Sequence, residues 1–278
     1  MTRPRTGYPY LDAGIDQAGS VLAMAHRGGP APVGGPGPGY EAQLDLEPLL
    51  ENTVAAFEHA VALGYTYLET DVHATSDGVL LAFHDAVLDR LTDRVGTVAG
   101  MRYAELADAR VGGREPIPTL ASLLERFPDA RFNIDIKSPA AVAPLAQLIR
   151  EAGSEDRVCV GSFSNRRLAA FRRLAGPRVA TSCGPAAVAV HRSGARLVAG
   201  RLGGNVLQVP AQYGPVTVVT GRFVAKAHAM GMPVHVWTVN ERAEMERLLD
   251  LGVDGLLSDR IEVLRDVLRG RGQWQAAA

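Results

Sequence analysis

Residues 67–85, YLETDVHATSDGVLLAFHD, place acids and histidines in a segment that otherwise has the composition of a buried strand. Side chains on a strand alternate between its two faces, so Glu69, Asp71 and His73 are predicted to share one face. Burying an unpaired carboxylate costs several kcal/mol, which is comparable with the stability of a whole domain. A bound cation or strong protein partners must compensate for this cluster, and the segment therefore predicts a functional site.

Further charged residues occur where other predicted strands end. They are His26 and Arg27 after the first strand, His84 and Asp85 beyond the second, and Asp135 and Lys137 around the end of the third. The carboxylates of Glu69, Asp71 and Asp135 form an all-oxygen set, which suits Mg²⁺ or Ca²⁺ better than zinc. Arg27 and Lys137 would add fixed positive charge, as a phosphate ester needs when negative charge grows in its transition state.

The two histidines complete this set of reactive groups. An imidazole has an ordinary pKa near 6.5, so one of His26 and His84 can take a proton from a nucleophile while the other protonates the leaving alkoxide. A cation, a positively charged clamp and an acid–base pair together indicate cleavage of a phosphoester.

The elements that must position these residues follow from the hydrophobic pattern. Short apolar runs alternate with longer stretches of helical periodicity from Val21 onward. Strands are predicted at 21–26, 67–72, 131–136, 157–162, 178–182, 205–209, 233–239 and 254–258. Helices are predicted at 52–63, 119–127, 140–152, 165–175, 186–198, 221–230, 241–251 and 260–268.

Eight strands and eight helices in about 250 residues are typical of an α/β protein built as a closed (β/α)₈ TIM barrel, here in a single domain. A doubly wound open sheet is the alternative, and no Gly-rich dinucleotide fingerprint supports it. In such a barrel the active site lies at the carboxyl ends of the strands. The charged residues at the ends of the first three strands are therefore expected to converge in one pocket.

Two stretches interrupt the alternation of strands and helices. A Gly/Pro-rich loop at 29–50, after the first strand, is too long for a plain turn and is expected to lie over the site. An excursion at 87–118, after the second strand, is predicted to carry a short surface helix. The predicted organisation is an N-terminal extension at 1–20, a barrel at 21–270 and a C-terminal tail at 271–278.

Taken together, these motifs resemble the glycerophosphodiester phosphodiesterase family. The resemblance is carried by AHRGG at 25–29, ENT at 51–53, ETDVHATSDGVLLAFHD at 69–85, IPTL at 117–120, NIDIK at 133–137 and WTVN at 237–240. It implies a barrel enzyme that uses a divalent cation to hydrolyse glycerophosphodiesters to glycerol 3-phosphate and an alcohol. It also implies that the glycerol 2-hydroxyl attacks phosphorus and that water then opens a cyclic phosphate.

The resemblance assigns roles to matching residues of this chain. It implies that His26 and His84 are the acid–base pair, that Glu69 and Asp71 are metal ligands, and that Arg27 and Lys137 bind phosphate. Asp135 stands where most of the family would have Glu, and its reach is shorter by about 1.5 Å. The related sphingomyelinase D toxins resemble this site and use Asp there, so we expect Asp135 to be the third ligand. The 22 residues between Gly28 and Glu51 exceed the family's usual handful, so the size of the leaving alcohol stays open.

Several residues near these motifs have two interpretations. Glu51, His73 and Asp85 are candidates for contacts that support the metal ligands. Glu51 can also bind the metal itself or only complement the dipole of the next helix, and His73 can simply line the pocket wall. Trp237 is expected to form an apolar wall beside the glycerol, with packing inside the barrel as the alternative. Asp259 is expected to cap the last helix.

Composition limits the class of partner. A net charge of −1 and a pI near 6.7 argue against nucleic acid, so any anion that the protein binds is expected to be small, as is the phosphodiester substrate that the resemblance implies. No apolar run precedes Val21 and no stretch approaches transmembrane length, which predicts a cytoplasmic protein without stable membrane insertion. Cys159 and Cys183 are expected to be buried, reduced thiols. The sequence makes no prediction of oligomeric state.

Two alternative functions remain open at this point. A lysophospholipase D that acts on membrane-derived substrates would need an apolar groove or an amphipathic surface, for which the loop at 29–50 is the only candidate. A non-catalytic barrel that binds phosphate metabolites would fold and bind metal without turnover. The presence of both His26 and His84 argues against this second alternative.

Overall fold

A computed structural model of the chain describes residues 4–13, 20–30, 50–193 and 203–274. Most of the loop predicted at 29–50 and the end of the helix predicted at 186–198 lie outside these described residues.

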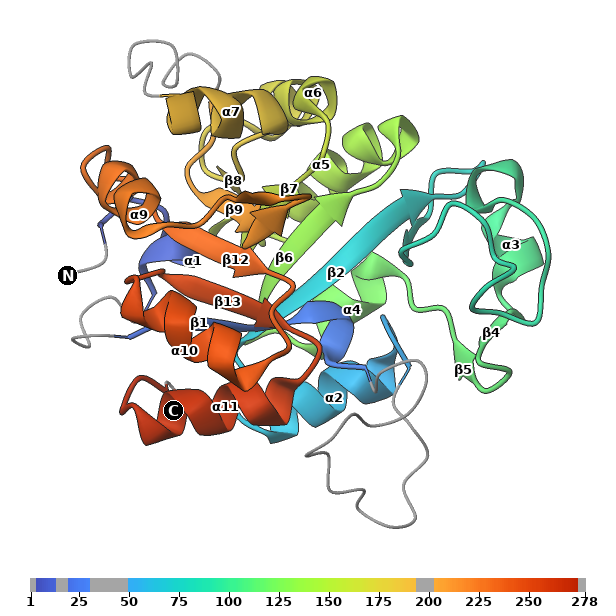
Figure 1. The fold of residues 1–278 in the computed structure, drawn as a ribbon. Helices are drawn as coiled ribbons and strands as arrows, with labels where there is room; N and C mark the ends of the chain where they lie inside the picture. The colour runs from blue at the N-terminus through green and yellow to red at the C-terminus, as the bar shows by residue number, and fades with distance from the viewer. Residues whose placement is uncertain (1–3, 14–19, 31–49, 194–202, 275–278) are drawn as a thin grey trace.

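All eight predicted strands are present, and they form one curled parallel sheet (Figure 1). The strands are β1 (Leu22–Ala25), β2 (Tyr67–Ala74), β6 (Arg131–Ile136), β7 (Val158–Gly161), β8 (Ala180–Thr181), β9 (Leu207–Pro210), β12 (Val234–Trp237) and β13 (Gly255–Ser258). Their order in the sheet is β8-β7-β6-β2-β1-β13-β12-β9. A one-residue parallel bridge between Ser182 and Val206 joins the segments next to β8 and β9, the two ends of this order. The architecture is therefore α/β and TIM-barrel-like.

Helices follow the strands along the chain and pack around the sheet (Figure 1). They are α2 (Val54–Ala62), α4 (Leu120–Arg126), α5 (Val142–Glu151), α6 (Asn165–Ala175), α7 (Pro185–Ser193), α9 (Gly221–His228), α10 (Arg242–Asp250) and α11 (Ile261–Gly270). Hydroxyl side chains at Thr53, Thr119, Ser164 and Thr220 accept backbone N–H bonds at the starts of α2, α4, α6 and α9, which satisfies otherwise unpaired donors. None of the described helices is long and apolar enough to cross a membrane.

The segment between β2 and α4 leaves the sheet. It contains β3 (Leu80–Ala82), which pairs antiparallel with β2, the helix α3 (Tyr103–Leu106), and a small hairpin of β4 (Arg110–Val111) and β5 (Glu115–Pro116). Phe83, Leu88, Val98 and Val111 belong to a separate buried cluster in this segment. The excursion thus has its own small hydrophobic core, which holds it beside the end of β2.

The amino-terminal segment packs against the sheet through α1 (Pro9–Asp12). Tyr10 and Leu11 are buried in a cluster that includes Leu22 and Met24 at the beginning of the barrel. The ring of Tyr10 contacts that of Tyr67 edge to face, with 5.1 Å between centroids. These contacts fill the end of the barrel opposite to the ends of the strands where the charged residues lie. The division into extension, barrel and tail remains a prediction.

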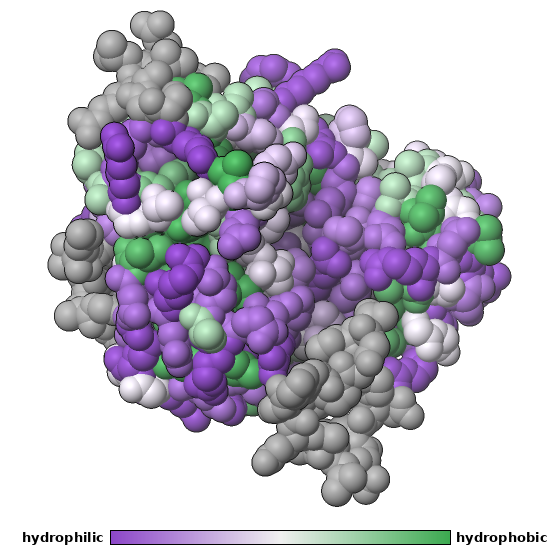
Figure 2. All heavy atoms as spheres, in the orientation of Figure 1, coloured by the Kyte–Doolittle hydropathy of each residue, from purple (hydrophilic) through white to green (hydrophobic). Residues whose placement is uncertain are grey.

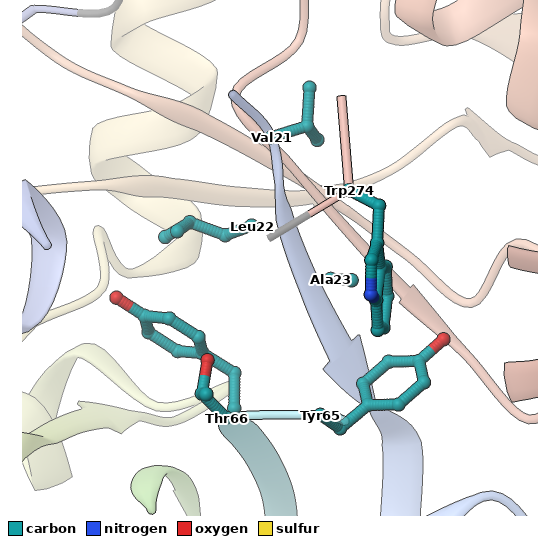
Figure 3. Close-up of a pocket in the computed structure, with 7 residues that line it drawn as sticks. Val21, Leu22, Ala23, Tyr65, Thr66 and Trp274 are labelled. Carbon is teal, nitrogen blue, oxygen red and sulfur yellow. The ribbon is translucent and has the colours of Figure 1, made fainter. Parts of the chain in front are cut away.

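A very small cavity lies at the beginnings of β1 and β2 (Figure 3). Trp274 covers Val21 and Ala23 there, and its ring contacts that of Tyr65 with 4.9 Å between centroids. The volume of the cavity is about 10 Å³, which is room for about one water molecule. This cavity is a packing feature and does not serve as a ligand site.

Candidate active site

A cavity of about 840 Å³ opens at the carboxyl ends of the strands. Eight of the predicted site residues line it: His26, Arg27, Glu69, Asp71, His84, Asp135, Lys137 and Trp237. Glu51, His73 and Asp85 are not among its lining residues, but each contacts a residue that is. These residues are far apart in the sequence. Strand pairing and the local structure of each element bring them together.

Strand pairing places the carboxylates. Glu69 and Asp71 are two residues apart on β2 and so point to the same face, and Asp71 lies directly opposite Asp135 of β6 in the parallel register. All three side chains are buried. Lys137 follows directly after β6, two residues beyond Asp135. Its backbone N–H donates to Val72 O of β2 at 3.1 Å, which continues the pairing of the two strands.

The Lys137 ammonium lies between two of the carboxylates. Its Nζ is 2.8 Å from Asp71 Oδ1 and 2.7 Å from Asp135 Oδ2. Burial alone would lower the pKa of Lys137, but the two carboxylates outweigh burial and raise it. For Asp71, burial acts to raise the pKa, and Lys137 and Arg27 outweigh it, so the pKa is lowered. Lys137 and Asp71 therefore stay charged at neutral pH.

A tight turn at the end of β1 presents His26 and Arg27. The residues His26–Gly28 form a 3₁₀ turn in which Arg27 has a positive φ of 51°. The Arg27 backbone N–H donates to Glu69 Oε2 at 3.0 Å, and its Nε lies 3.0 Å from Asp71 Oδ2. These two contacts tie the turn to β2 and aim the guanidinium at the carboxylate cluster.

His26 is held by an acid that sequence reasoning assigned to another role. Its Nδ1 lies 2.6 Å from Asp259 Oδ1, and Asn240 donates to the other oxygen of Asp259 at 2.8 Å. The prediction that Asp259 caps the last helix is wrong: α11 begins after Arg260 and has no side-chain cap. Because β13 pairs with β1, the residue after β13 lies beside the residue after β1, although they are 233 positions apart.

The protonation of His26 reflects its neighbours. Burial acts to lower its pKa, but Glu69, whose Oε2 is 3.8 Å from His26 Nε2, and Asp259 outweigh it, so the pKa is raised. At Asp259, burial acts to raise the pKa of the carboxyl group, but the hydrogen bond to His26 and the charge of its ring outweigh burial, so the pKa is lowered. The pair is an imidazole and a carboxylate that stabilise each other's charged forms.

His84 has a similar arrangement on the other side of the cluster. Its Nδ1 lies 2.6 Å from Asp85 Oδ1, and Arg90 binds both oxygens of Asp85 at 2.6 and 3.1 Å. The bond to Arg90, with that to His84, lowers the pKa of Asp85 to about 2 despite burial. His73 Nε2 lies 3.1 Å from the carbonyl oxygen of His84, so its ring supports the backbone that carries His84. Burial lowers the pKa of His73 itself.

A row of ion pairs joins the two histidine-bearing segments. Arg90 also contacts Glu51 Oε1 at 3.1 Å, and the same oxygen accepts from Arg27 Nη1 at 3.1 Å. Glu51 therefore bridges two arginines and does not merely face a helix end. Sequence reasoning did not assign Arg90 or Asn240 to the site: Arg90 lies in no motif, Asn240 is known only as the last residue of WTVN at 237–240, and both reach the site through other side chains.

The buried carboxylates Glu69, Asp71 and Asp135 offer oxygen ligands to a divalent cation. Among the described residues, no three acidic, histidine or cysteine side chains are arranged as a ready metal site. The donor chemistry nevertheless fits: Asp135 Oδ1 is buried without a hydrogen-bond partner, and burial, with the nearby charge of Asp71, raises the pKa of Glu69 to about 7. A hard cation would satisfy the unpaired oxygen and relieve the repulsion between Glu69 and Asp71.

The rest of the cavity lining is mostly apolar, although it also includes Arg192 and Gln208. Its apolar residues are Phe163, Pro185, Val188, Ala189, Val209, Pro210, Tyr213, Val216, Val218 and Trp237. Trp237 stands at the boundary, where its ring contacts that of Phe163 edge to face at 5.2 Å. The cavity is thus divided between a charged wall on β1, β2 and β6 and an apolar wall that extends from β7 to β12.

The remaining histidines and thiols lie outside the charged cluster. His59 pairs with Glu262 at 2.7 Å, His228 pairs with Asp254 at 2.7 Å, and His191 contacts the ring of Phe223. Cys159 and Cys183 are buried and free, as predicted. Burial raises the pKa of Cys183 to about 12, so this thiol is not an activated nucleophile.

The curled parallel sheet and the charged cluster at its carboxyl edge define a TIM-barrel-like α/β protein with a charged pocket in the place where such barrels carry their active sites. The profile of the glycerophosphoryl diester phosphodiesterase family matches residues 26–263. The chain is 38% identical over 265 residues to "Probable glycerophosphodiester phosphodiesterase 2" of Mycobacterium tuberculosis (strain ATCC 25618 / H37Rv), covering 93% of this chain and 95% of that protein. It is 30% identical over 270 residues to the glycerophosphodiester phosphodiesterase of Caldanaerobacter subterraneus subsp. tengcongensis, covering 91% and 99%.

A solved structure shares the fold. The Oleispira antarctica phosphodiesterase, whose structure was solved in complex with the product sn-glycerol-3-phosphate, superposes with a TM-score of 0.71 at 22% identity, and the match covers 89% of this chain and 96% of that chain. The chain belongs to the glycerophosphoryl diester phosphodiesterase family and is a phosphoric diester hydrolase.

Proposed function

We propose that this enzyme hydrolyses glycerophosphodiesters to glycerol 3-phosphate and an alcohol, with His26 and His84 as its acid–base pair. The observation that supports this most strongly is that two carboxylate-bound imidazoles, two cations and three carboxylates line one cavity. Family membership supports the same substrate class.

Arg27 and Lys137 would bind the phosphate. Both are anchored by Asp71, so their positive charge is fixed before substrate arrives and needs little reorganisation during the reaction. Such fixed charge stabilises the transition state more than it stabilises the ground state, because negative charge on the phosphoryl group grows as the reaction proceeds.

The histidines would move the protons. Asp259 and Asp85 accept from Nδ1 of His26 and His84, which leaves each Nε2 as the atom for proton transfer. One imidazole takes the proton of the attacking hydroxyl, and the other gives a proton to the leaving alkoxide. Each transfer is worth about 10² to 10⁴ in rate.

Glu69, Asp71 and Asp135 would hold a divalent cation, Mg²⁺ or Ca²⁺. When bound, such a cation offsets charge on the phosphoryl oxygens as a Lewis acid. In this chain the role of Asp135 would be to offer its unpaired Oδ1.

A lysophospholipase D-type reaction is the second candidate, and the apolar half of the cavity favours it. Glycerol and small head groups are polar and do not need a wall of ten largely apolar side chains, whereas an acyl chain does. A non-catalytic barrel is disfavoured because the chain belongs to a family of hydrolases and keeps both histidines. A cytoplasmic location and the lack of a nucleic-acid partner remain predictions from the sequence.

The experiment is an assay of glycerophosphocholine, glycerophosphoethanolamine and lysophosphatidylcholine after dialysis against EDTA, with and without added Mg²⁺ or Ca²⁺. We expect release of glycerol 3-phosphate from the first two substrates only when a cation is added. Equal turnover in EDTA would reject the metal-dependent mechanism. Faster cleavage of lysophosphatidylcholine would favour the second candidate.

A further inference from the structure

The charge of this chain is distributed very unevenly. Residues 157–240 contain eleven Lys and Arg and no Asp or Glu, whereas the whole chain has a net charge of −1. The rest of the chain therefore carries a net charge of −12. The basic stretch includes the strands and helices from β7 to β12, which form the apolar wall of the cavity.

Several of these bases lie on the face where the cavity opens. Arg166 and Arg222 are exposed in the first turns of α6 and α9, and these helices begin just after the carboxyl ends of strands. Arg192 of α7 is exposed and lines the cavity. A cation in the first turn of a helix is disfavoured by the helix dipole, so Arg166 and Arg222 are not there to stabilise their helices.

Large apolar side chains are exposed around the same opening. Phe163 is 60% exposed, Tyr213 is 78% exposed and Val216 is 39% exposed, and all three line the cavity. Tyr213 and Val216 pair across the small hairpin of β10 (Gln212–Tyr213) and β11 (Val216–Thr217), which projects between β9 and α9. We call Phe163, Tyr213, Val216, Arg166, Arg192 and Arg222 the rim.

The rim combines the two features that bind a protein to an anionic membrane surface. Exposed apolar side chains gain by burial at the boundary of the acyl chains, and arginines gain by attraction to anionic lipid head groups. The surface in Figure 2 shows pale and green atoms around α7, between strongly purple regions of the molecule. An acidic protein surface would complement the arginines but would not by itself account for the three apolar side chains.

We propose that the rim docks on a bilayer that contains anionic lipid, so that the mouth of the cavity faces the membrane surface. Charge complementarity selects this occupant: the exposed rim arginines Arg166, Arg192 and Arg222 would face the anionic lipid. The apolar half of the cavity is continuous with the rim, which gives a single-chain lipid a path from the bilayer to the charged wall. This docking does not depend on the proposed reaction, because binding can be measured without turnover.

The test is co-sedimentation of the full chain with vesicles of phosphatidylcholine alone or mixed with phosphatidylglycerol, at low and high salt. We expect binding to the mixed vesicles, weak binding to phosphatidylcholine, and loss of binding at high salt. R166Q should weaken the partition coefficient about fivefold, as expected for one arginine near an anionic surface. Y213S/V216S should weaken it at least about tenfold, because two apolar anchors are removed.

Two matched controls separate the rim from general effects. R173Q removes an exposed arginine from the last turn of the same helix, α6, and V95S removes a valine that is 80% exposed on the excursion after β2. Both should bind the mixed vesicles as the unchanged protein does, and melting temperatures would show that every variant is folded. Equal binding to the two vesicle types, or equal weakening by R173Q and R166Q, would overturn the proposal. Hydrolysis of soluble glycerophosphocholine without vesicles tests the proposed function separately.

Discussion

Two histidines in matching environments stand at the centre of the site. Each donates a hydrogen bond from Nδ1 to a carboxylate at 2.6 Å, Asp259 for His26 and Asp85 for His84, although the first pair is 233 positions apart in the chain and the second is adjacent. Each carboxylate is held in turn, Asp259 by Asn240 and Asp85 by Arg90. A carboxylate fixed in this way sets the tautomer and the direction of the ring.

Replacing His84 with Ala should therefore reduce kcat about 10² to 10⁴-fold, because a proton-transfer group is lost. The melting temperature should change little, since His84 is only partly buried. Steady-state kinetics with glycerophosphocholine and a thermal melt give both numbers.

His59→Ala is the matched control, because His59 also pairs with a carboxylate, Glu262 at 2.7 Å, but lies outside the cavity. It should retain full kcat. A His84 variant as active as the His59 variant would refute the acid–base assignment.

The Glu69 carboxyl makes stability depend on pH in the metal-free protein. Burial raises its pKa to about 7, so the folded state keeps this proton to higher pH than the unfolded state does. Stability should fall as pH rises from the ordinary carboxyl range through about 7. The raised pKa of His26 acts in the same direction, because the extra stability of its charged form is lost as pH rises through the folded-state value.

We expect the melting temperature in EDTA to fall by several degrees between about pH 5 and pH 8. Glu69→Gln should flatten this slope, since it removes the titrating carboxyl and the main charge that raises the pKa of His26. It should also weaken binding of Mg²⁺ or Ca²⁺ in calorimetry. Parallel slopes for the two proteins would contradict the assignment of this titration to Glu69.

At the scale of elements, the 3₁₀ turn after β1 depends on a glycine. Gly28 has φ of +84°, and a Cβ there would lie 2.8 Å from Ala56 Cβ and 3.0 Å from the Ala56 backbone carbon of α2. The turn can approach α2 so closely only without a side chain. This approach determines where His26 and Arg27 stand relative to β2.

Gly28→Ala should lower the free energy of unfolding by about 2 to 4 kcal/mol, the sum of backbone strain and forced displacement of α2 or the turn. It should also reduce kcat/KM, because the turn carries His26 and Arg27. Gly78→Ala is the matched control: its φ of +85° is the same, but nothing lies within 4 Å of its Cβ.

In Gly78→Ala the free energy of unfolding should fall only by the backbone strain, about 1 kcal/mol, and the activity should be unchanged. Denaturant unfolding and steady-state kinetics measure both effects. Equal losses in the two variants would show that close packing of the turn on α2 is unimportant.

The elements also show where sequence reasoning succeeds and where it fails. Alternation along β2 and the pairing of β2 with β6 bring Glu69, Asp71 and Asp135 to one wall, because the side-chain period of a strand is a local property. The prediction that Asp259 caps the last helix is wrong because its partner His26 is adjacent only once β13 pairs with β1. Arg90 was missed for a related reason: its contacts to Asp85 and Glu51 depend on how the excursion folds back.

At the scale of the whole molecule, the number and places of the strands follow from the hydrophobic pattern. The strands at 131–136 and 254–258 are buried at nearly every position, polar residues such as Asn133 and Asp135 included, because parallel strands in this fold are covered on both faces. The hydrophobic pattern does not predict which side chains fill the end of the barrel where the strands begin. Tyr10 and Leu11 lie in a short polar-flanked segment, and their burial depends on the curvature of the complete sheet.

Tyr10→Ala should lower the free energy of unfolding by about 3 kcal/mol, because the fully buried ring packs on Tyr67 and leaves a cavity when removed. For a chain of this size that loss corresponds to roughly 6 to 12 °C in melting temperature. Activity at 25 °C should stay within about twofold, since Tyr10 lies at the end of the barrel away from the charged wall.

Tyr8→Ala is the control for this prediction, because Tyr8 lies in the same segment but is only half-buried. It should cost about 1 kcal/mol or less. If Tyr10→Ala melts like Tyr8→Ala, the amino-terminal segment does not stabilise the barrel.

The most direct test of the central claim is a crystal structure of the enzyme with a divalent cation and sn-glycerol 3-phosphate. The account predicts one cation bound by Glu69, Asp71 and Asp135, with the phosphate in contact with Arg27 and Lys137 and within reach of Nε2 of both His26 and His84. A cation bound by other residues, or a phosphate that only one of the two imidazoles can reach, would contradict it.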